Sequence, residues 1–344
     1  MHGRRRGTVE MNPVERVQRA VRWVDTWQQR HRPAAFVFAV FKKFGDDQAG
    51  NLVSLLTYNA FLATFPLLLV LVTITGIVLR NHAGLQRQVV NSAFSEFPIV
   101  GGQLHEQLGV TAFQGTGLAL TVGIVGAVWG ARGFANAVQN TLNTLWAIPK
   151  VDRPGFPGNL LRSIGLLAVL AFTVAVPICA AALTAAGSRV GLSGLPAQLL
   201  VLVVSSLLDG ALFLGVFRLA TAAQVSTRAL IPGAFVAGVA WQLLLNLAGV
   251  LLSHTVRHAE AIAGLFGIVL GLLSWFALQA TITVYAIEAD VVRALKLWPR
   301  SLTQPPLTRA DKSYLTAVTG AEARRPEQRI DVEFTPPDRP APEK

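Results

Sequence analysis

Six long apolar runs with almost no charged side chains dominate the sequence and limit what it can fold into. Charged residues bound five of them: Asp47 to Arg80, Glu106 to Arg132, Arg162 to Arg189, Arg228 to Arg257, and Glu260 to Glu288. A sixth run, 190–217, contains the single charge Asp209. About 20 apolar residues are enough for a helix to cross a bilayer. One such run could be a buried helix of a soluble protein, but six in succession indicate a polytopic membrane protein.

The pattern predicts helices, because the runs are continuously apolar and do not alternate as barrel strands do. We therefore expect an all-α fold, a bundle of six transmembrane helices within a membrane domain at 35–298. The predicted spans are 52–79, 113–131, 163–187, 196–217, 229–252 and 262–287. Only 14% of the residues are charged, against about 25% in soluble domains. Close helix packing is expected at a series of glycines: Gly115, Gly117, Gly123, Gly126 and Gly130.

Two segments flank this domain. Residues 1–34 are basic, and Val14, Val17, Val21 and Val24 recur there at helical spacing opposite arginines. This pattern suits a helix in the inner membrane interface, and it suits a solvated cytoplasmic helix equally well. Residues 299–344 are rich in proline and charge, which predicts a disordered cytoplasmic tail. The loop at 81–110 is long and polar enough for one or two short periplasmic helices.

Lysine and arginine lie mostly on one side of the predicted spans. The predicted outer segments carry only four of them: Arg80, Arg87, Arg189 and Arg257. Because cytoplasmic loops are enriched in these residues, we expect an inner-membrane protein with both termini in the cytoplasm. The net charge of +11 then comes from basic residues that face the anionic membrane lipids, which we expect as partners. We expect no nucleic-acid partner.

Asp209 is the most informative candidate residue. It lies roughly 20 Å along a span that begins near Pro196, hence within the bilayer. An acid at this depth is costly and is a functional-site hypothesis by default. It predicts a cavity-lining or proton-coupling carboxylate. Pairing with a neighbouring helix, or access to water at the inner interface, are alternatives.

The first predicted span has an unusually polar first half. Asn51, Tyr58 and Asn59 lie there, followed by Pro66. A lipid-facing helix would not retain so many hydrogen-bonding groups, so we expect this face to point into the bundle.

Further polar residues lie near the inner ends of the spans. Asn143 follows the second span, and Glu288 directly follows the last apolar run; we count both as candidate functional residues. Asp290 and Arg293, three apart, predict a pair on the helix surface. Helix capping alone explains Asp46 and Asp47.

Signatures of catalysis and of metal binding are missing from the sequence. His254 and His258 have the spacing of zinc ligands, but neither an HExxH pattern nor a third ligand accompanies them. Cys179, the single cysteine, lies in an apolar run, which leaves no thiol metal site. We therefore expect no enzymatic activity, no cofactor and no bound metal.

Four segments, in this order, resemble one known family: DDQAGNLVSLLTYNAFLATFPLLLVL, ARGFANAVQNTLNTLWAIPKVDRPGF, RALIPGAFVAGVAWQLL and GLLSWFALQATITVYAIEADVVRAL. They are similar to the YihY/virulence factor BrkB family of bacterial inner-membrane proteins over roughly residues 35–298. The resemblance implies a six-span helical fold. It also implies that the family's former label, ribonuclease BN, is mistaken for this chain too.

Three functions remain as hypotheses. The first is a transporter or exporter of an envelope-related amphipathic or lipid-like molecule, and the second is a non-catalytic membrane scaffold with a partner-recruiting tail. The third, least favoured, is a ribonuclease. A transporter needs a continuous polar cavity, whereas a scaffold can have a dry core. A homo-oligomer is compatible with all three.

Overall fold

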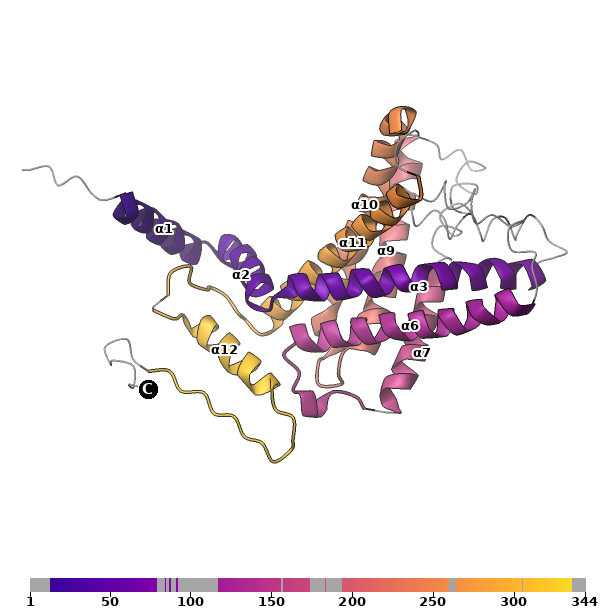
Figure 1. The fold of residues 1–344 in the computed structure, drawn as a ribbon. Helices are drawn as coiled ribbons and strands as arrows, with labels where there is room; N and C mark the ends of the chain where they lie inside the picture. Colours follow the sequence, from indigo (N-terminus) through magenta and orange to yellow (C-terminus); the bar gives the residue numbers. More distant parts are fainter. Residues whose placement is uncertain are drawn as a thin grey trace, which may run out of the picture.

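The computed structural model of the chain is built from helices (Figure 1). It describes residues 13–78, 117–155, 157–173, 194–259, 264–304 and 306–335, with a few isolated positions between them. Within these ranges no β-strand occurs, and the all-α prediction is confirmed. The helices are α1 (Pro13–Arg30), α2 (Arg32–Asp46), α3 (Ala49–Val78), α6 (Gly117–Leu145), the 3-10 helix η1 (Lys150–Asp152), α7 (Gly158–Thr173), α9 (Leu195–Ala220), α10 (Thr227–Ala259), α11 (Gly264–Ala294) and α12 (Arg309–Ala321).

Within the described residues, four helices are long and apolar enough to cross a membrane. The qualifying segments are Ala49–Leu68, Leu195–Ala220, Thr227–Ala248 and Val269–Ala294, and they match four of the six predicted spans. Helix α6 overlaps the predicted second span, and α7 contains the beginning of the third. The rest of the third span and most of the 81–110 loop lie outside the described residues. The count of six spans therefore stays a prediction.

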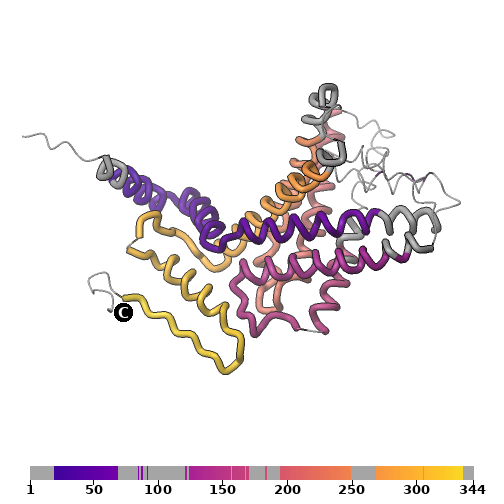
Figure 2. The backbone as a smooth tube through the Cα atoms, viewed as in Figure 1, coloured from indigo at the N-terminus to yellow at the C-terminus, as the bar shows by residue number. Residues whose placement is uncertain are grey.

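The long helices form two pairs. Helix α3 packs along α6, and α9 packs along α10 with α7 beside it, while α11 contacts both α3 and α10. Figures 1 and 2 show the pairs close together at the end where α2 and α12 lie, and diverging away from it. We call this shared end the junction. Its core contains fully buried side chains from several helices: Leu142, Leu145, Phe217, Leu230, Val284 and Ile287.

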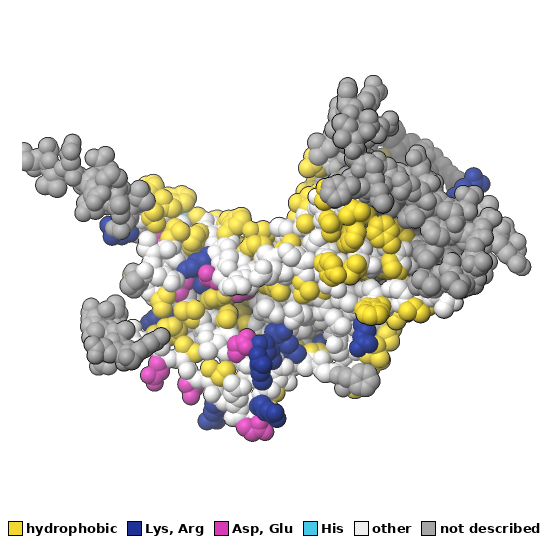
Figure 3. All heavy atoms as spheres, viewed as in Figure 1, with side chains coloured by type: hydrophobic (Ala, Val, Ile, Leu, Met, Phe, Trp, Pro, Cys, Tyr) yellow, Lys and Arg dark blue, Asp and Glu magenta, His cyan; other side chains and the backbone are white. Residues whose placement is uncertain are grey.

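The outer surface of the long helices is apolar. Figure 3 shows hydrophobic side chains over the part of the molecule away from α12, and most of the visible charged side chains nearer to α12. Trp129 of α6, for example, is 79% exposed. Such extensive apolar surface is unfavourable in water and is compatible with solvation by lipid.

Small residues allow both pairs to pack closely. A Cβ atom at Gly130 would lie 2.8 Å from the Cα of Ala63, and one at Gly126 would lie 3.3 Å from Pro66. Both glycines face α3, which confirms the expected close packing for these two. Between α9 and α10, a Cβ at Gly238 would collide with the backbone nitrogen of Gly210. Small residues of this kind let membrane helices approach backbone to backbone.

The C-terminal segment differs from the predicted disordered tail. Residues 309–321 form α12, whose N-terminus is closed by a capping box between Thr308 and Asp311. Asp311 and Tyr314 are buried in contacts with the rest of the protein. The prediction was wrong here because proline and charge lower the hydrophobicity of the segment, whereas α12 is held by a few specific polar contacts.

Gly238 provides a test of the α9–α10 contact. We expect Gly238→Ala to lower the stability of the detergent-solubilised protein by about 1–3 kcal/mol, because an added methyl group forces two backbones apart. Thermal unfolding followed by size-exclusion chromatography measures the effect. Gly50→Ala in α3 is the control, since nothing lies within 4 Å of its Cβ position. Equal stability of the two variants would contradict the close α9–α10 contact.

Candidate functional site

A buried lysine organises the junction. Lys43 lies in the last turn of α2, and Asp47 caps that helix by donating its backbone N–H to the carbonyl of Lys43. Gln48 then adopts a positive φ of 50°, and the chain turns into α3. Lys43 and Asp47 are four residues apart at the end of α2, so their side chains lie on the same side, within the junction.

The Lys43 ammonium uses all three of its hydrogens. It donates to Asp47 Oδ2 at 2.5 Å, to Glu288 Oε2 at 2.8 Å and to the carbonyl of Leu145 at 2.9 Å. The side chains of Lys43, Asp47 and Glu288 are at most 6% exposed. Buried charges persist only when paired and hydrogen-bonded, so this arrangement ties α2, α6 and α11 together.

Tyr314 of α12 extends this ion cluster. Its hydroxyl donates to Asp47 Oδ1 at 2.5 Å. Burial raises the pKa of Tyr314 well above its ordinary value, and the adjacent negative charge of Asp47 raises it further. The phenol therefore stays neutral and acts as a donor. Glu288 Oε1 is buried and has no hydrogen-bond partner within the described part of the chain.

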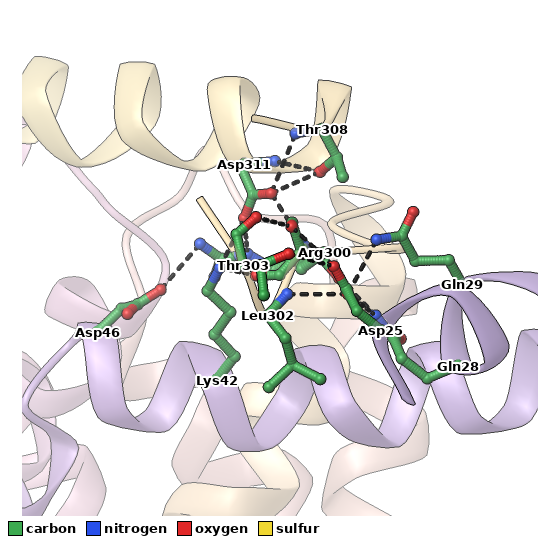
Figure 4. Close-up of polar contacts among 11 residues, drawn as sticks. Asp25, Gln28, Gln29, Lys42, Asp46, Arg300, Leu302, Thr303, Thr308 and Asp311 are labelled. Carbon is green, nitrogen blue, oxygen red and sulfur yellow. Dashed lines mark hydrogen bonds and ion pairs between the residues drawn. The ribbon is translucent and has the colours of Figure 1, made fainter. Parts of the chain in front are cut away.

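A second ion cluster surrounds Arg300 (Figure 4). Its Nε donates to Asp311 Oδ1 at 2.9 Å, and its Nη2 lies 2.8 Å from Asp46 Oδ2. The guanidinium carbon is 4.2 Å from the centre of the Tyr314 ring, a cation–π distance. Lys42 also donates to Asp311 Oδ1, at 3.1 Å. Tyr314 thus contacts both clusters.

Burial alone would raise the pKa of Asp311, but hydrogen bonds lower it to about 2. The donors are the Thr308 hydroxyl, the Ser301 backbone N–H, Arg300 and Lys42. At neutral pH the carboxylate is therefore fully charged, as its cationic partners require.

Asp25 of α1 is held in a similar way. It accepts hydrogen bonds from the backbone N–H of Leu302 at 2.9 Å and from the hydroxyl of Thr303 at 3.0 Å. Gln28 and Gln29, from its own helix, also donate to it. Burial opposes the charge, but these bonds bring the pKa of Asp25 well below its ordinary range.

Asp209 lies at the α9–α10 contact. It is 6% exposed, and its Oδ2 accepts a hydrogen bond of 2.5 Å from the side-chain amide of Gln242. No ion pair of Asp209 occurs among the residues that the structure describes. Its neighbour is therefore a neutral amide from the adjacent helix.

Asn143 fixes the chain after α9. Its side-chain amide donates to the carbonyls of Gln139 and Ala220, and its oxygen accepts from the Ala222 N–H at 2.9 Å. These contacts give Asn143 a clear positioning function, because they connect the end of α6 to the turn that follows α9.

The polar residues of the first span point in different directions. Asn51 donates to Gln48 near the surface, and Tyr58 is 59% exposed. Asn59 faces Gly133 of α6, and Pro66 faces Gly126 of the same helix. Only part of the expected inward face is therefore observed. In the described structure, none of the seven candidate residues predicted from the sequence forms a hydrogen bond with another of them. These residues are Asn51, Tyr58, Asn59, Pro66, Asn143, Asp209 and Glu288.

Asp290 was expected to form a pair with Arg293 on the helix surface, but its side chain is buried. It lies 3.6 Å from Arg293, yet it is 1% exposed and accepts a 2.9 Å hydrogen bond from the Gly233 N–H. Arg293 donates to the carbonyl of Ala229 at 2.9 Å. Together they contact the α10 backbone on both sides of Pro232, where proline interrupts helical hydrogen bonding.

Comparison with known proteins places the chain among bacterial membrane proteins. The model of the virulence factor BrkB family matches residues 40–309. The chain belongs to this family. As a BrkB-family protein it is 24% identical to the inner membrane protein YhjD of Escherichia coli, over 80% of this chain and 87% of YhjD. It is 23% identical to the "putative ribonuclease-like protein YfkH" of Bacillus subtilis, over 75% of this chain and 94% of YfkH.

No solved structure matches the chain significantly. Among the described residues, no group of three or more His, Cys, Asp or Glu side chains is arranged to hold a metal ion. The side chains of His254 and His258 lie outside the described part. The junction of this BrkB-family protein contains the ion pairs of Lys43 and Arg300 with their carboxylate partners.

Replacement of Lys43 tests the ion cluster. We expect Lys43→Met to destabilise the protein by about 3–5 kcal/mol, because two buried carboxylates lose their cation. The measurement is thermal unfolding in detergent together with the amount of protein in the membrane. Lys150→Met, which breaks an exposed pair with Glu322, is the control and should have little effect. Similar unfolding temperatures for both variants would contradict the structural importance of Lys43.

Acid should release the docked α12. A carboxyl whose pKa is lowered by folding stabilises the fold above the pKa of the unfolded chain, and this contribution is lost as pH falls through the folded pKa. The stability difference between wild type and Asp311→Asn should be constant from about pH 5 to 7 and shrink from about pH 4 towards 2.

Thermal unfolding of the detergent-solubilised proteins across this pH range measures the difference. The exposed Asp331 provides the control, and Asp331→Asn should follow wild type throughout. A difference that persists unchanged to about pH 2 would show that the charge of Asp311 does not hold α12.

Proposed function

We propose that this inner-membrane protein transports or exports an envelope-related amphipathic or lipid-like molecule and catalyses no reaction. The proposal includes six spans, both termini in the cytoplasm and α1 at the inner interface. Its membership of the BrkB family and its relation to an inner membrane protein support the location. The unequal distribution of lysine and arginine supports the orientation.

The observation that carries the transport proposal is the environment of Asp209. About 14 residues after the start of α9, it lies roughly 21 Å along that helix. It is buried beside Gln242, and within the described part of the chain it pairs with no cation. An intramembrane acid that is retained without a charged partner favours a role in a substrate or ion pathway.

The arrangement of the helix pairs also supports transport. The α3–α6 pair and the α9–α10 pair meet at the junction and diverge away from it (Figure 1). Rocking of helix bundles around a fixed point is a common way to expose a site to either side of a membrane. The buried Lys43 cluster connects α6 of the first pair to α11, and α11 in turn contacts α10 of the second pair.

A scaffold is the second candidate. The observation that favours it is the stretch after α12, where most side chains between residues 322 and 335 are exposed. An exposed segment without regular secondary structure can be bound by another protein as an extended peptide, here by a cytoplasmic partner.

Substitutions at Asp209 separate these roles. Asp209→Asn keeps an oxygen that accepts from Gln242 but cannot ionise, so we expect normal stability and loss of function. Asp209→Leu removes the acceptor and leaves the half-buried amide of Gln242 without this partner, so we expect a loss of stability of about 1 kcal/mol. Rescue of a gene-deletion phenotype and transfer of fluorescent phospholipid across liposome membranes measure function, and thermal unfolding measures stability.

The two variants are compared at equal abundance in the membrane. If Asp209→Asn is as unstable as Asp209→Leu, the residue is structural. If Asp209→Asn is stable and fully active, the carboxylate has no role in transport and the scaffold becomes the better proposal.

A further inference from the structure

Helix α1 has an unusual distribution of polar and apolar side chains. Its polar residues Asp25 and Gln28 are buried, at 6% and 3% exposure, whereas Trp23 and Trp27 are 68% and 47% exposed. Two residues along an α-helix correspond to a rotation of about 200°. Both tryptophans therefore lie opposite Asp25. A helix that turns its polar side inwards and its aromatic side outwards is not adapted to contact with water alone.

The C-terminal segment fixes this orientation. Ser301, Leu302 and Thr303 donate hydrogen bonds to Asp25, and Gln28 donates to the carbonyl of Arg300 at 2.7 Å. Figure 4 shows Asp25 pointing from α1 towards this segment. Rotation of α1 about its axis would break these contacts, so the outward direction of the tryptophans is built into the fold.

Arginines share the aromatic side of α1. Arg19, Trp23 and Trp27 are spaced by four residues and Arg30 follows three residues later, so all four lie along one stripe. Both arginines are exposed, and neither forms an ion pair with any described residue. The helix places Val21 and Val24 opposite Arg19, in agreement with the sequence pattern, and places Trp23 and Trp27 on the same side as Arg19.

The exposed apolar surface continues onto α2. Val37 and Phe41 are 52% and 57% exposed, and α2 leads directly into the first span, α3. In Figure 3, hydrophobic side chains lie along the upper surface of the region that α1 and α2 form in Figure 1. The surface is therefore continuous with the apolar surface of the spans.

We propose that this face, formed by Arg19, Trp23, Trp27, Arg30, Val37 and Phe41, binds the membrane surface and selects anionic phospholipids. Tryptophan is favoured at the level of the head groups. Arginine extends its apolar stem along the membrane and pairs its guanidinium with phosphate. The inference deepens the proposed position of α1 at the inner interface, on which it rests, and it does not require transport.

A fluorescent label on full-length protein tests the contact. The only cysteine is removed as Cys179→Ala, and a nitrobenzoxadiazole label is attached at Ala20→Cys, which is exposed on the tryptophan side, or at Ser313→Cys, exposed on α12. The proteins are placed in nanodiscs of phosphatidylcholine with or without phosphatidylglycerol, each containing lipid spin-labelled near the head group.

We expect the label at position 20 to shift to shorter wavelength and to be quenched, more strongly with phosphatidylglycerol. The label at position 313 should show neither effect. Replacement of both arginines (Arg19→Gln with Arg30→Gln) should abolish the dependence on phosphatidylglycerol. Arg309→Gln, an exposed position on α12, should retain it.

Different outcomes contradict different claims. If the label at position 20 is as water-exposed as that at 313, the face does not bind lipid. Shielding from water without quenching by spin-labelled lipid would indicate a protein partner instead and would also overturn the proposal. Neither result affects the transport proposal, which fails separately if Asp209→Asn remains active.

Discussion

The buried ammonium of Lys43 is the interaction on which the junction depends. A lysine removed from water is tolerated only when its hydrogens find acceptors and its charge finds a counter-charge. Here the acceptors come from Asp47, Glu288 and the Leu145 carbonyl, which belong to different parts of the chain. Because all three must be within hydrogen-bonding distance together, the ends of α2, α6 and α11 have little freedom to shift independently.

The terminal segments are attached to this centre through Tyr314. It donates to Asp47 and lies beneath the guanidinium of Arg300, so it belongs to both ion clusters. Arg300 precedes the residues that hold Asp25 of α1. The N-terminal helix, the junction and α12 are therefore connected by one polar network, which runs from Asp25 through the C-terminal segment to Asp47.

The sequence predicted what is encoded locally. Apolar runs without charges are sufficient to recognise the long helices, since length and hydrophobicity alone determine whether a helix can cross a bilayer. Glu288 was identified because it ends such a run. Its partner Lys43 was not, because the two residues are far apart in the sequence and no pattern connects them.

Helix α12 also combines a local sequence signal with contacts between residues that are distant in the sequence. Its start carries a local signal, the capping pair Thr308 and Asp311, which could have been found in the sequence. Its docking depends on Arg300, Lys42 and Asp47, and only the fold brings these together. The orientation of α1 about its own axis was not predicted either. Periodicity shows which residues share a face of a helix, but the contacts of Asp25 with residues 301–303 determine which face is turned inwards.

The buried acids differ in what a proton would do to them. Glu288 is tied to the charge of Lys43, so protonation would remove an attraction on which the junction depends. Asp209 is held by the amide of Gln242, and an amide N–H can donate to an oxygen of a carboxylate and, more weakly, to the carbonyl oxygen of a carboxylic acid. A change of charge at Asp209 therefore need not break the contact between α9 and α10. Protonation of Asp209 would therefore weaken one hydrogen bond between α9 and α10 and leave the ion pairs of the junction intact, which is compatible with the proposed transport role.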